Sequence, residues 1–247
     1  MTEPILEVRN LCKRYPGFQL QDVSFTIPRG CIMGFIGRNG AGKTTTLKSI
    51  LNLVHADSGE VRYFGLELHA HEQEIKQRIG YAGGAVDYYK KKRIRDIVSV
   101  TGAFYENWDT VAFRKTMEAF DLDQSKTPAQ LSEGMKVKLN LALALSHGAE
   151  LLILDEPTSG LDPVSRDELL DIFTVLRDRG VSILFSTHIT SDLNKCADRI
   201  TYIRQGKILA SDSMEAYLAA CREAEIGATL EEIMLHHEKE DFREKLG

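Results

Sequence analysis

The sequence contains few cysteines, and they are widely separated. The four cysteines are Cys12, Cys31, Cys196 and Cys221, with no CxxC pair and no histidine at ligand spacing. Disulfide frameworks and zinc sites are recognised by paired cysteine spacings, which are missing here. We therefore expect neither kind of site, and reduced, mostly buried thiols instead.

Long apolar runs and an excess of positive charge are also missing. No apolar run approaches the roughly 18 residues of a membrane-spanning helix, and the start, MTEPILEVRN, has neither the basic nor the apolar region of a signal peptide. We expect the chain to be neither secreted nor membrane-spanning. The formal net charge is −5, so the basic field of a dedicated nucleic-acid binder is absent and nucleic acid is not expected as a partner.

The composition is typical of a folded domain. Of the 247 residues, 43% are hydrophobic and 27% are charged, which leaves no compositional case for disorder. This length suits one substantial core, or a core with a small lobe. We expect one unit with lobes.

The first part of the chain has strand patterns around a glycine-rich loop. Alternating apolar residues at 5–15 and 20–28 predict two short strands, and the more continuous apolar run at 31–37 predicts a third. After the loop, helical spacing at 43–54 leads through turn residues into another strand within 55–65. This order of strand, loop, helix and strand is typical of P-loop folds.

Helical and strand patterns alternate in the rest of the chain. Residues 88–147 have helix-like segments and predict a helical lobe. Buried-strand patterns at 151–157 and 181–188 lie on either side of a helical pattern at 165–180, and such a βαβ unit implies a parallel sheet. A hairpin is expected at 199–209.

Together these patterns predict an α/β fold with a P-loop NTPase core and a parallel sheet, an N-terminal antiparallel β subdomain and an inserted helical subdomain. The expected division is 1–87 and 148–212 for the nucleotide-binding core with the β subdomain, 88–147 for the helical subdomain, and 213–247 for a C-terminal helical tail.

Residues 37–44, GRNGAGKT, match the phosphate-binding pattern GxxxxGK[ST] between a predicted strand and a predicted helix. The glycines let backbone N–H groups converge on phosphate oxygens at the helix N-terminus, Lys43 adds a cation, and the Thr44 hydroxyl can bind Mg²⁺. A simple glycine turn would not explain this context. The residues expected to bind the nucleotide here are Gly37, Asn39, Gly40, Ala41, Gly42, Lys43, Thr44 and Thr45.

Two carboxylates, Asp155 and Glu156, follow the apolar run LLIL. Ligands of open α/β sheets collect at the C-terminal edge of the strands, where these carboxylates are expected. We expect Asp155 to hold Mg²⁺ and Glu156 to orient or deprotonate the attacking water. Taken alone, the pair before Pro157 is explained equally well as a strand end, but the phosphate loop favours the catalytic interpretation.

The stretch LSEGM at 131–135 stands between a helical lobe and LLILDEP. The LSGGQ signature of the ATP-binding cassette (ABC) family occupies the same place, and the sequence resembles that family over nearly its whole length. The resemblance implies that Tyr15 stacks on adenine, that Asp162 in SGLD belongs to the D-loop, and that His188 in STH is the switch histidine. Each residue alone is explained more simply as a structural one. The resemblance implies ATP and Mg²⁺ as cofactors and catalytic roles for Lys43, Glu156 and His188.

Ser132 is expected to cap the helix that follows the signature, and the first N–H groups of that helix form an anion site. In the family that the sequence resembles, the phosphate comes from a second subunit. ATP then lies between the Lys43 loop of one chain and Ser132 and Gly134 of the other. The resemblance therefore implies a second ABC ATPase subunit as a partner, either identical or different.

The sequence departs from the family pattern in two places. Glu133 and Met135 replace a glycine and the glutamine of the signature. Gly84 stands where the family usually has the glutamine that links metal, attacking water and membrane partner. With that glutamine missing, and with Asp87 as a neighbouring side chain that could fill the metal shell, we expect slow hydrolysis by the isolated chain.

The helical lobe, with YENWD and FDLD, and the tail, with TLEEIML, resemble the cassettes of bacterial ABC-2-type exporters. This implies an ATPase subunit on the cytoplasmic face of the cell membrane, attached to a separate integral membrane permease that exports a drug, an antimicrobial peptide or a similar substrate. The basic cluster KKKRIRD at 90–96 could face lipid headgroups or an acidic permease loop, although a solvated surface is the simpler interpretation.

Two other classes are weighed against the exporter. A soluble ABC ATPase that acts on DNA or ribosomes is expected to carry long coiled-coil insertions or two cassettes, and the sequence has neither. A small-molecule kinase with a P-loop would leave the LSEGM signature unexplained. The transported substrate is not encoded in this chain, because cargo selection belongs to the permease.

Overall fold

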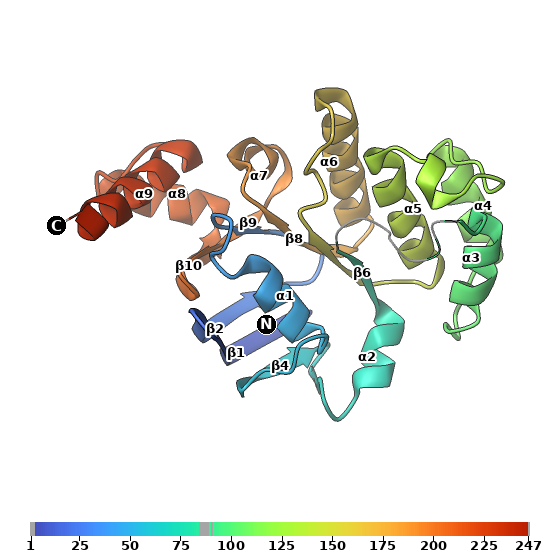
Figure 1. Cartoon of the computed structure of the whole chain (residues 1–247), viewed down its shortest axis with the longest axis horizontal. Helices are drawn as coiled ribbons and strands as arrows, with labels where there is room; N and C mark the ends of the chain where they lie inside the picture. Colours follow the sequence, from blue (N-terminus) through green and yellow to red (C-terminus); the bar gives the residue numbers. More distant parts are fainter. Residues whose placement is uncertain (1–2, 84–88, 90, 247) are drawn as a thin grey trace.

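A computed structural model of the chain describes residues 3–83, 89 and 91–246. Its strands form two sheets (Figure 1). The antiparallel sheet has the order β2-β1-β4-β5, and the larger sheet has the order β10-β9-β3-β8-β7-β6. The strands are β1 (Leu6–Tyr15), β2 (Phe18–Ile27), β3 (Ile32–Ile36), β4 (Ser58–Tyr63), β5 (Leu66–Glu67), β6 (Ile79–Gly83), β7 (Leu151–Asp155), β8 (Ser182–Thr187), β9 (Arg199–Arg204) and β10 (Lys207–Ser213).

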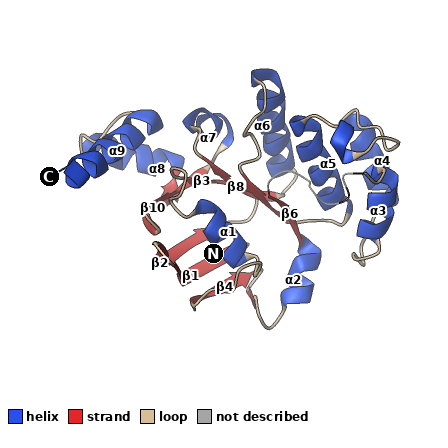
Figure 2. Cartoon of the chain, in the orientation of Figure 1, coloured by secondary structure: helices blue, strands red, loops and turns tan. Residues whose placement is uncertain are grey.

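Helices surround the sheets on several sides (Figure 2). They are α1 (Lys43–Ile50), α2 (Glu72–Arg78), α3 (Ile94–Gly102), α4 (Thr110–Ala119), α5 (Glu133–Ser146), α6 (Pro163–Asp178), α7 (Thr190–Cys196), α8 (Met214–Glu223) and α9 (Leu230–Leu246), with a 3-10 turn at Pro128–Gln130. Within the described part of the chain, none of these helices has the length and apolar character to cross a membrane.

The central strands of the larger sheet are buried on both faces and are mostly apolar. Every residue of β3 and β8 is buried. Because side chains of a strand alternate between faces, Leu151 and Ile153 pack towards α1 and the antiparallel sheet, whereas Leu152 and Leu154 pack towards α6 and α7. Burial of one such leucine stabilises the fold by about 1.5–3 kcal/mol, so the two apolar layers hold the sheet rigidly.

The helical lobe and the tail lie at opposite ends of the long axis of the molecule (Figure 1). The lobe, α3 to α5, has its own apolar cluster, which includes Ile94, Phe113 and Leu139. The tail is anchored by Leu230 and Ile233, which are buried in the cluster that covers α6 and α7. This architecture confirms the predicted fold class. The division into 1–87 with 148–212, 88–147 and 213–247 stays a proposal, since its boundary at 87/88 lies outside the described residues.

The parallel strands β3, β8 and β7 are neighbours in the larger sheet, and their carboxyl ends lie side by side along one edge of it. Their register sets Ile36 beside Thr187 and Asp155 beside Ser186. The chain continues from these strand ends into the glycine-rich loop, Glu156 and His188. Three segments that are far apart in the sequence are thereby brought to the same edge.

Two local predictions can be compared with the structure. The hairpin between β9 and β10 turns at Gln205 and Gly206, whose φ angles are 49° and 76°; a two-residue hairpin turn with positive φ at both positions matches the strand twist. The first helix was predicted to reach 54 but ends at Ile50, and Asn52 is left-handed with φ 54°. A left-handed residue stops an α-helix, which periodicity alone does not reveal.

Glu150 joins the start of β7 to two other elements. Its carboxylate accepts hydrogen bonds from Arg78 (2.6 Å) and Arg29 (3.0 Å), and these two guanidinium groups, Arg78 first, hold the pKa of Glu150 below its usual range. A carboxyl group with a lowered pKa stabilises the fold above its unfolded-state pKa, about 4.3, and this stabilisation is lost as the pH falls through the folded-state pKa.

Glu150→Gln is therefore expected to lower the melting temperature at pH 7 by a few degrees, since a partly exposed ion pair contributes up to about 1 kcal/mol. The difference from the wild type should shrink as the pH falls below about 4.3. Melting curves between pH 7 and pH 3.5 measure it. The matched control is Glu118→Gln, an exposed glutamate for which the described residues provide no ion pair. A difference that is independent of pH would contradict the role of the Glu150 charge.

Candidate functional site

The glycine-rich loop needs its glycines for steric reasons. Gly42 has φ 115°, in the left-handed region, and an added Cβ would lie 2.9 Å from Phe18 and 2.8 Å from Leu20. A Cβ on Gly37 would clash with the backbone of Ile203. The loop is thus packed tightly between β2 and β9, with its backbone fixed ahead of α1, which begins at Lys43.

Lys43 folds back over this loop. Its side chain is almost buried, with 5% exposed, and Nζ donates to the carbonyl oxygens of Gly37 (2.7 Å) and Arg38 (3.2 Å). The same ammonium lies 3.2 Å from Glu156 Oε1. The loop therefore encloses a cation next to backbone N–H groups at a helix N-terminus, an arrangement that binds phosphate.

Asp155 and Thr44 place two oxygen atoms side by side. Thr44 Oγ1 donates to Asp155 Oδ2 at 2.8 Å, and both residues line a cavity of about 360 Å³ together with Glu156. Mg²⁺ prefers hard oxygen ligands and keeps several of its waters, and water occupies roughly 30 Å³ per molecule. The hydroxyl, the carboxylate and the space beside them fit a hydrated Mg²⁺.

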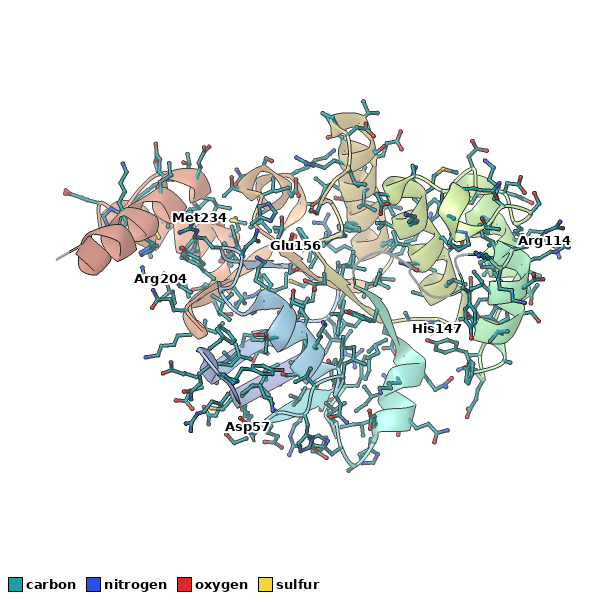
Figure 3. All side chains as sticks on the ribbon, in the orientation of Figure 1. Asp57, Arg114, His147, Glu156, Arg204 and Met234 are labelled. Carbon is teal, nitrogen blue, oxygen red and sulfur yellow. The ribbon has the colours of Figure 1, made fainter. Side chains whose placement is uncertain are left out.

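Glu156 lies near the middle of the molecule (Figure 3), between Lys43 and His188. One carboxylate oxygen faces Lys43, and the other lies 3.3 Å from His188 Nδ1. Its backbone is left-handed, with φ 49°, an uncommon conformation for a non-glycine residue that often marks functional sites. A carboxylate held between a cation and an imidazole can orient a water molecule and accept its proton.

The signature segment reaches the same cavity through Glu133, which lines it together with Thr44, Asp155 and Glu156. Ser132 caps α5, as predicted, since its Oγ accepts a hydrogen bond from Met135 N at 3.2 Å. A Cβ added to Gly134 would lie 3.5 Å from Ser165, near the start of α6. Among the described residues, no hydrogen bond or ion pair joins Ser132 or Gly134 to Lys43. The exposed N-terminus of α5 is therefore left available to a ligand from outside its own loop.

Asp162 and Tyr15 have structural partners within the chain. Asp162 caps α6: its carboxylate accepts from Val164 N and Ser165 N, both at 3.0 Å, and Ser165 in particular holds the pKa of Asp162 below its usual range. Tyr15, at the end of β1, is 39% exposed and pairs with Phe18, which packs against the loop at Gly42. Their roles towards a nucleotide remain proposals.

Some of the remaining predicted residues are described by the structure, and others lie outside the described part of the chain. Asn39 is exposed at the loop tip, and Thr45 is half-buried in α1. Gly84 and Asp87, which carry the expectation of slow hydrolysis, lie outside the described residues. In the basic cluster at 90–96, residue 90 also lies outside them, and Arg95 is exposed beside Asp96.

One buried residue at the site was not predicted. Ser186, near the end of β8, contacts both Asp155 and Glu156 through its hydroxyl group. The only signal in the sequence is a polar residue within an apolar strand, two positions before His188, and that signal does not identify its partners.

Comparison with known proteins gives a uniform result. A family model described as "ABC transporter" matches residues 20–159. The chain is 34% identical to the ABC transporter ATP-binding protein YtrB of Bacillus subtilis, covering 83% of this chain and 70% of that protein. It is also 34% identical to the bacitracin transport ATP-binding protein BcrA of Bacillus licheniformis, covering 83% and 68%. A solved structure of an ABC transporter ATP-binding subunit superposes with a TM-score of 0.82 at 27% identity, covering 94% of this chain and 98% of that one.

Proposed function

This chain belongs to the ABC transporter family and is one of its ATP-hydrolysing subunits, and we propose that two such subunits enclose two ATP molecules. The pair of subunits drives a separate membrane permease, which exports a drug or an antimicrobial peptide. The observation that carries the proposal is the convergence of Lys43, Glu156 and His188 at one sheet edge, with contacts of 3.2 and 3.3 Å.

The residues would divide the reaction among them. The loop N–H groups and Lys43 hold the phosphates, Tyr15 stacks on the adenine, and Thr44 and Asp155 would hold Mg²⁺. When bound, that ion neutralises charge on the phosphates. Glu156 orients and deprotonates the water that attacks the terminal phosphate, and His188 keeps the Glu156 carboxylate in place. Apart from the stacking by Tyr15, these roles require only side chains that already lie within hydrogen-bond reach of one another or of the loop.

The second subunit completes the site. Because Ser132 and the start of α5 lie exposed and are not joined to Lys43 of their own chain, they would bind the phosphates of an ATP held by the partner's loop. Asp162, at the start of α6 beside Gly134, would lie at the same interface. Both identical and different partners are compatible with this arrangement.

The proposal that the permease exports its substrate rests on the relatives of this chain. BcrA is by its name a bacitracin transport protein, and the proteins to which this chain is similar are transporter subunits. The soluble alternative, an ATPase that acts on ribosomes or DNA, therefore has less support. We propose that this chain works at the cytoplasmic face of the cell membrane, bound to its permease.

We propose that the permease binds this chain where α2 meets the helical lobe. A cavity of about 510 Å³ is lined there by α2 residues together with Glu106 and Asn107. Phe104, next to it, is 73% exposed. The Gln77 side chain holds the loop on both sides of Tyr105, because it donates to Phe104 O (2.8 Å) and accepts from Glu106 N (3.0 Å).

Residues of the helical lobe also hold the lobe against α2 at this place. Tyr105 stacks on His147, with ring centroids 3.7 Å apart, and His147 Nδ1 lies 3.1 Å from Gln77 O. Burial lowers the pKa of His147, so this contact is made by the neutral ring. An exposed phenylalanine on a loop whose backbone is held by hydrogen bonds, beside a polar cavity, suits the end of a permease helix with one apolar anchor and polar neighbours.

Phe104→Ser is expected to reduce capture of the permease by about 10-fold or more, since buried aromatic anchors contribute on the order of 2 kcal/mol at interfaces. The measurement is capture of multi-span membrane proteins from detergent-solubilised cell membranes by the purified chain. ATP affinity should be unchanged. Val175→Ser is the control, because Val175 is also exposed but lies on α6. Failure of the wild type to capture any membrane protein would contradict the proposed function.

A further inference from the structure

Ser186 is completely buried, with 0% exposed, near the C-terminal end of β8. Its hydroxyl group makes two hydrogen bonds. Oγ donates to Asp155 Oδ1 at 2.6 Å and accepts from the backbone N–H of Glu156 at 2.9 Å. One hydroxyl thus contacts both residues of the carboxylate pair.

The contact to Asp155 fixes the direction of its carboxylate. Thr44 Oγ1 donates to Oδ2 at 2.8 Å, while Ser186 donates to Oδ1. With both oxygens held, the carboxylate cannot turn about its χ2 axis without breaking a hydrogen bond. Such outer hydrogen bonds orient metal ligands, and their loss typically costs about 10–100-fold in metal affinity or activity.

The contact to Glu156 supports an uncommon backbone. Glu156 has φ 49°, a left-handed conformation that non-glycine residues disfavour. Its N–H bonds to Ser186, and its carbonyl accepts from Ser159 N at 3.1 Å. Together these bonds aim the Glu156 side chain at Lys43 and His188.

We infer that Ser186 is a positioning residue that couples the metal ligand to the catalytic base. Asp155 and Ser186 are neighbours in the register of β7 and β8, and His188 follows Ser186 by two residues. A single hydroxyl therefore links the strand that leads to His188 to the carboxylate of Asp155 and to the backbone of Glu156. The inference rests on the roles proposed above for Asp155 and Glu156.

Ser182, in the same strand, is a matched control that separates a purely structural role of Ser186 from a positioning role. Ser182 is also 0% exposed, and its Oγ accepts a hydrogen bond from Gly30 N at 2.8 Å. Ser182→Ala removes the same atom, and a hydrogen bond to a backbone N–H, near the other end of β8. It contacts neither carboxylate.

The experiment compares Ser186→Ala and Ser182→Ala with the wild type. Three quantities are measured. They are the affinity for ATP without metal, the Mg²⁺ concentration for half-saturation, and the turnover number. The Mg²⁺ half-saturation is read both from ATP hydrolysis and from the change in nucleotide binding. For Ser186→Ala we expect metal-free ATP affinity within about 2-fold of the wild type, a Mg²⁺ half-saturation raised about 10-fold and turnover lowered about 10-fold. Ser182→Ala should change none of the three by more than about 2-fold, even where its melting temperature falls.

Ser186→Cys is the second variant, because a thiol fills the space of the hydroxyl but is a weak donor. We expect it to shift the Mg²⁺ half-saturation in the same direction. It provides the measurement where the alanine variant does not fold. The inference is overturned when either Ser186 variant keeps wild-type Mg²⁺ dependence and turnover, or when Ser182→Ala shifts both by the same factor. The proposed function fails in a different way, when the wild type itself neither binds nor hydrolyses ATP in the presence of Mg²⁺.

Discussion

Glu156→Gln is expected to lower ATP turnover about 10³-fold, a loss of about 4 kcal/mol of transition-state stabilisation, while ATP still binds. The amide cannot accept the proton of the attacking water, but it keeps nearly the same shape. Removing the charge also releases Lys43 from the carboxylate 3.2 Å away, so phosphate binding is not weakened. An ATP-bound dimer should accumulate, because the hydrolysis that would open it is blocked.

Lys43→Ala provides the opposite phenotype. It removes the cation that the loop encloses, so ATP binding itself should be lost. Phosphate release, fluorescent-nucleotide binding and size-exclusion chromatography with ATP distinguish the two variants. Glu168→Gln serves as the control, since Glu168 is an exposed carboxylate on α6 that pairs with Lys138. Wild-type turnover by Glu156→Gln would show that the base has been assigned wrongly.

Ser132→Arg is expected to abolish turnover, by more than about 10²-fold, while the isolated chain still binds ATP. Ser132 caps α5 and is exposed, so an arginine there would enter the phosphate site of the partner subunit and not its own. The contrast between intact monomer binding and lost hydrolysis is the signature of a site shared by two chains. Ser125→Arg, at an exposed serine in the same lobe, controls for the added charge.

A mixing experiment makes this prediction sharper. Ser132→Arg and Lys43→Ala are each inactive alone. In a mixed dimer, one site carries both defects and the other carries neither, so activity should return in proportion to the mixed dimer formed. Phosphate release from mixtures at several ratios and protein concentrations measures it. Mixtures that stay as inactive as the separate variants, or wild-type turnover that does not depend on protein concentration, would contradict a shared site.

The parts of the site that could be predicted from the sequence are short and contiguous. The loop at 37–44 is expected to bind phosphate through its own backbone, and a helix begins within it at Lys43, so the chemistry is local. The signature works in the same way, because Ser132 caps the helix that begins one residue later. The alternation of buried strands and helices was sufficient for the fold class, since apolar periodicity records which faces are buried.

What the sequence could not determine depends on strand order and register. Lys43, Glu156 and His188 meet only because β3, β7 and β8 end at one edge of the sheet. Ser186 reaches Asp155 only because that register sets the two residues side by side, and a shift of one residue would turn the hydroxyl to the other face. Sequence patterns determine which residues are buried and which loops bind phosphate. Contacts between distant segments are decided by how the strands pair, and strand pairing is a property of the whole tertiary structure.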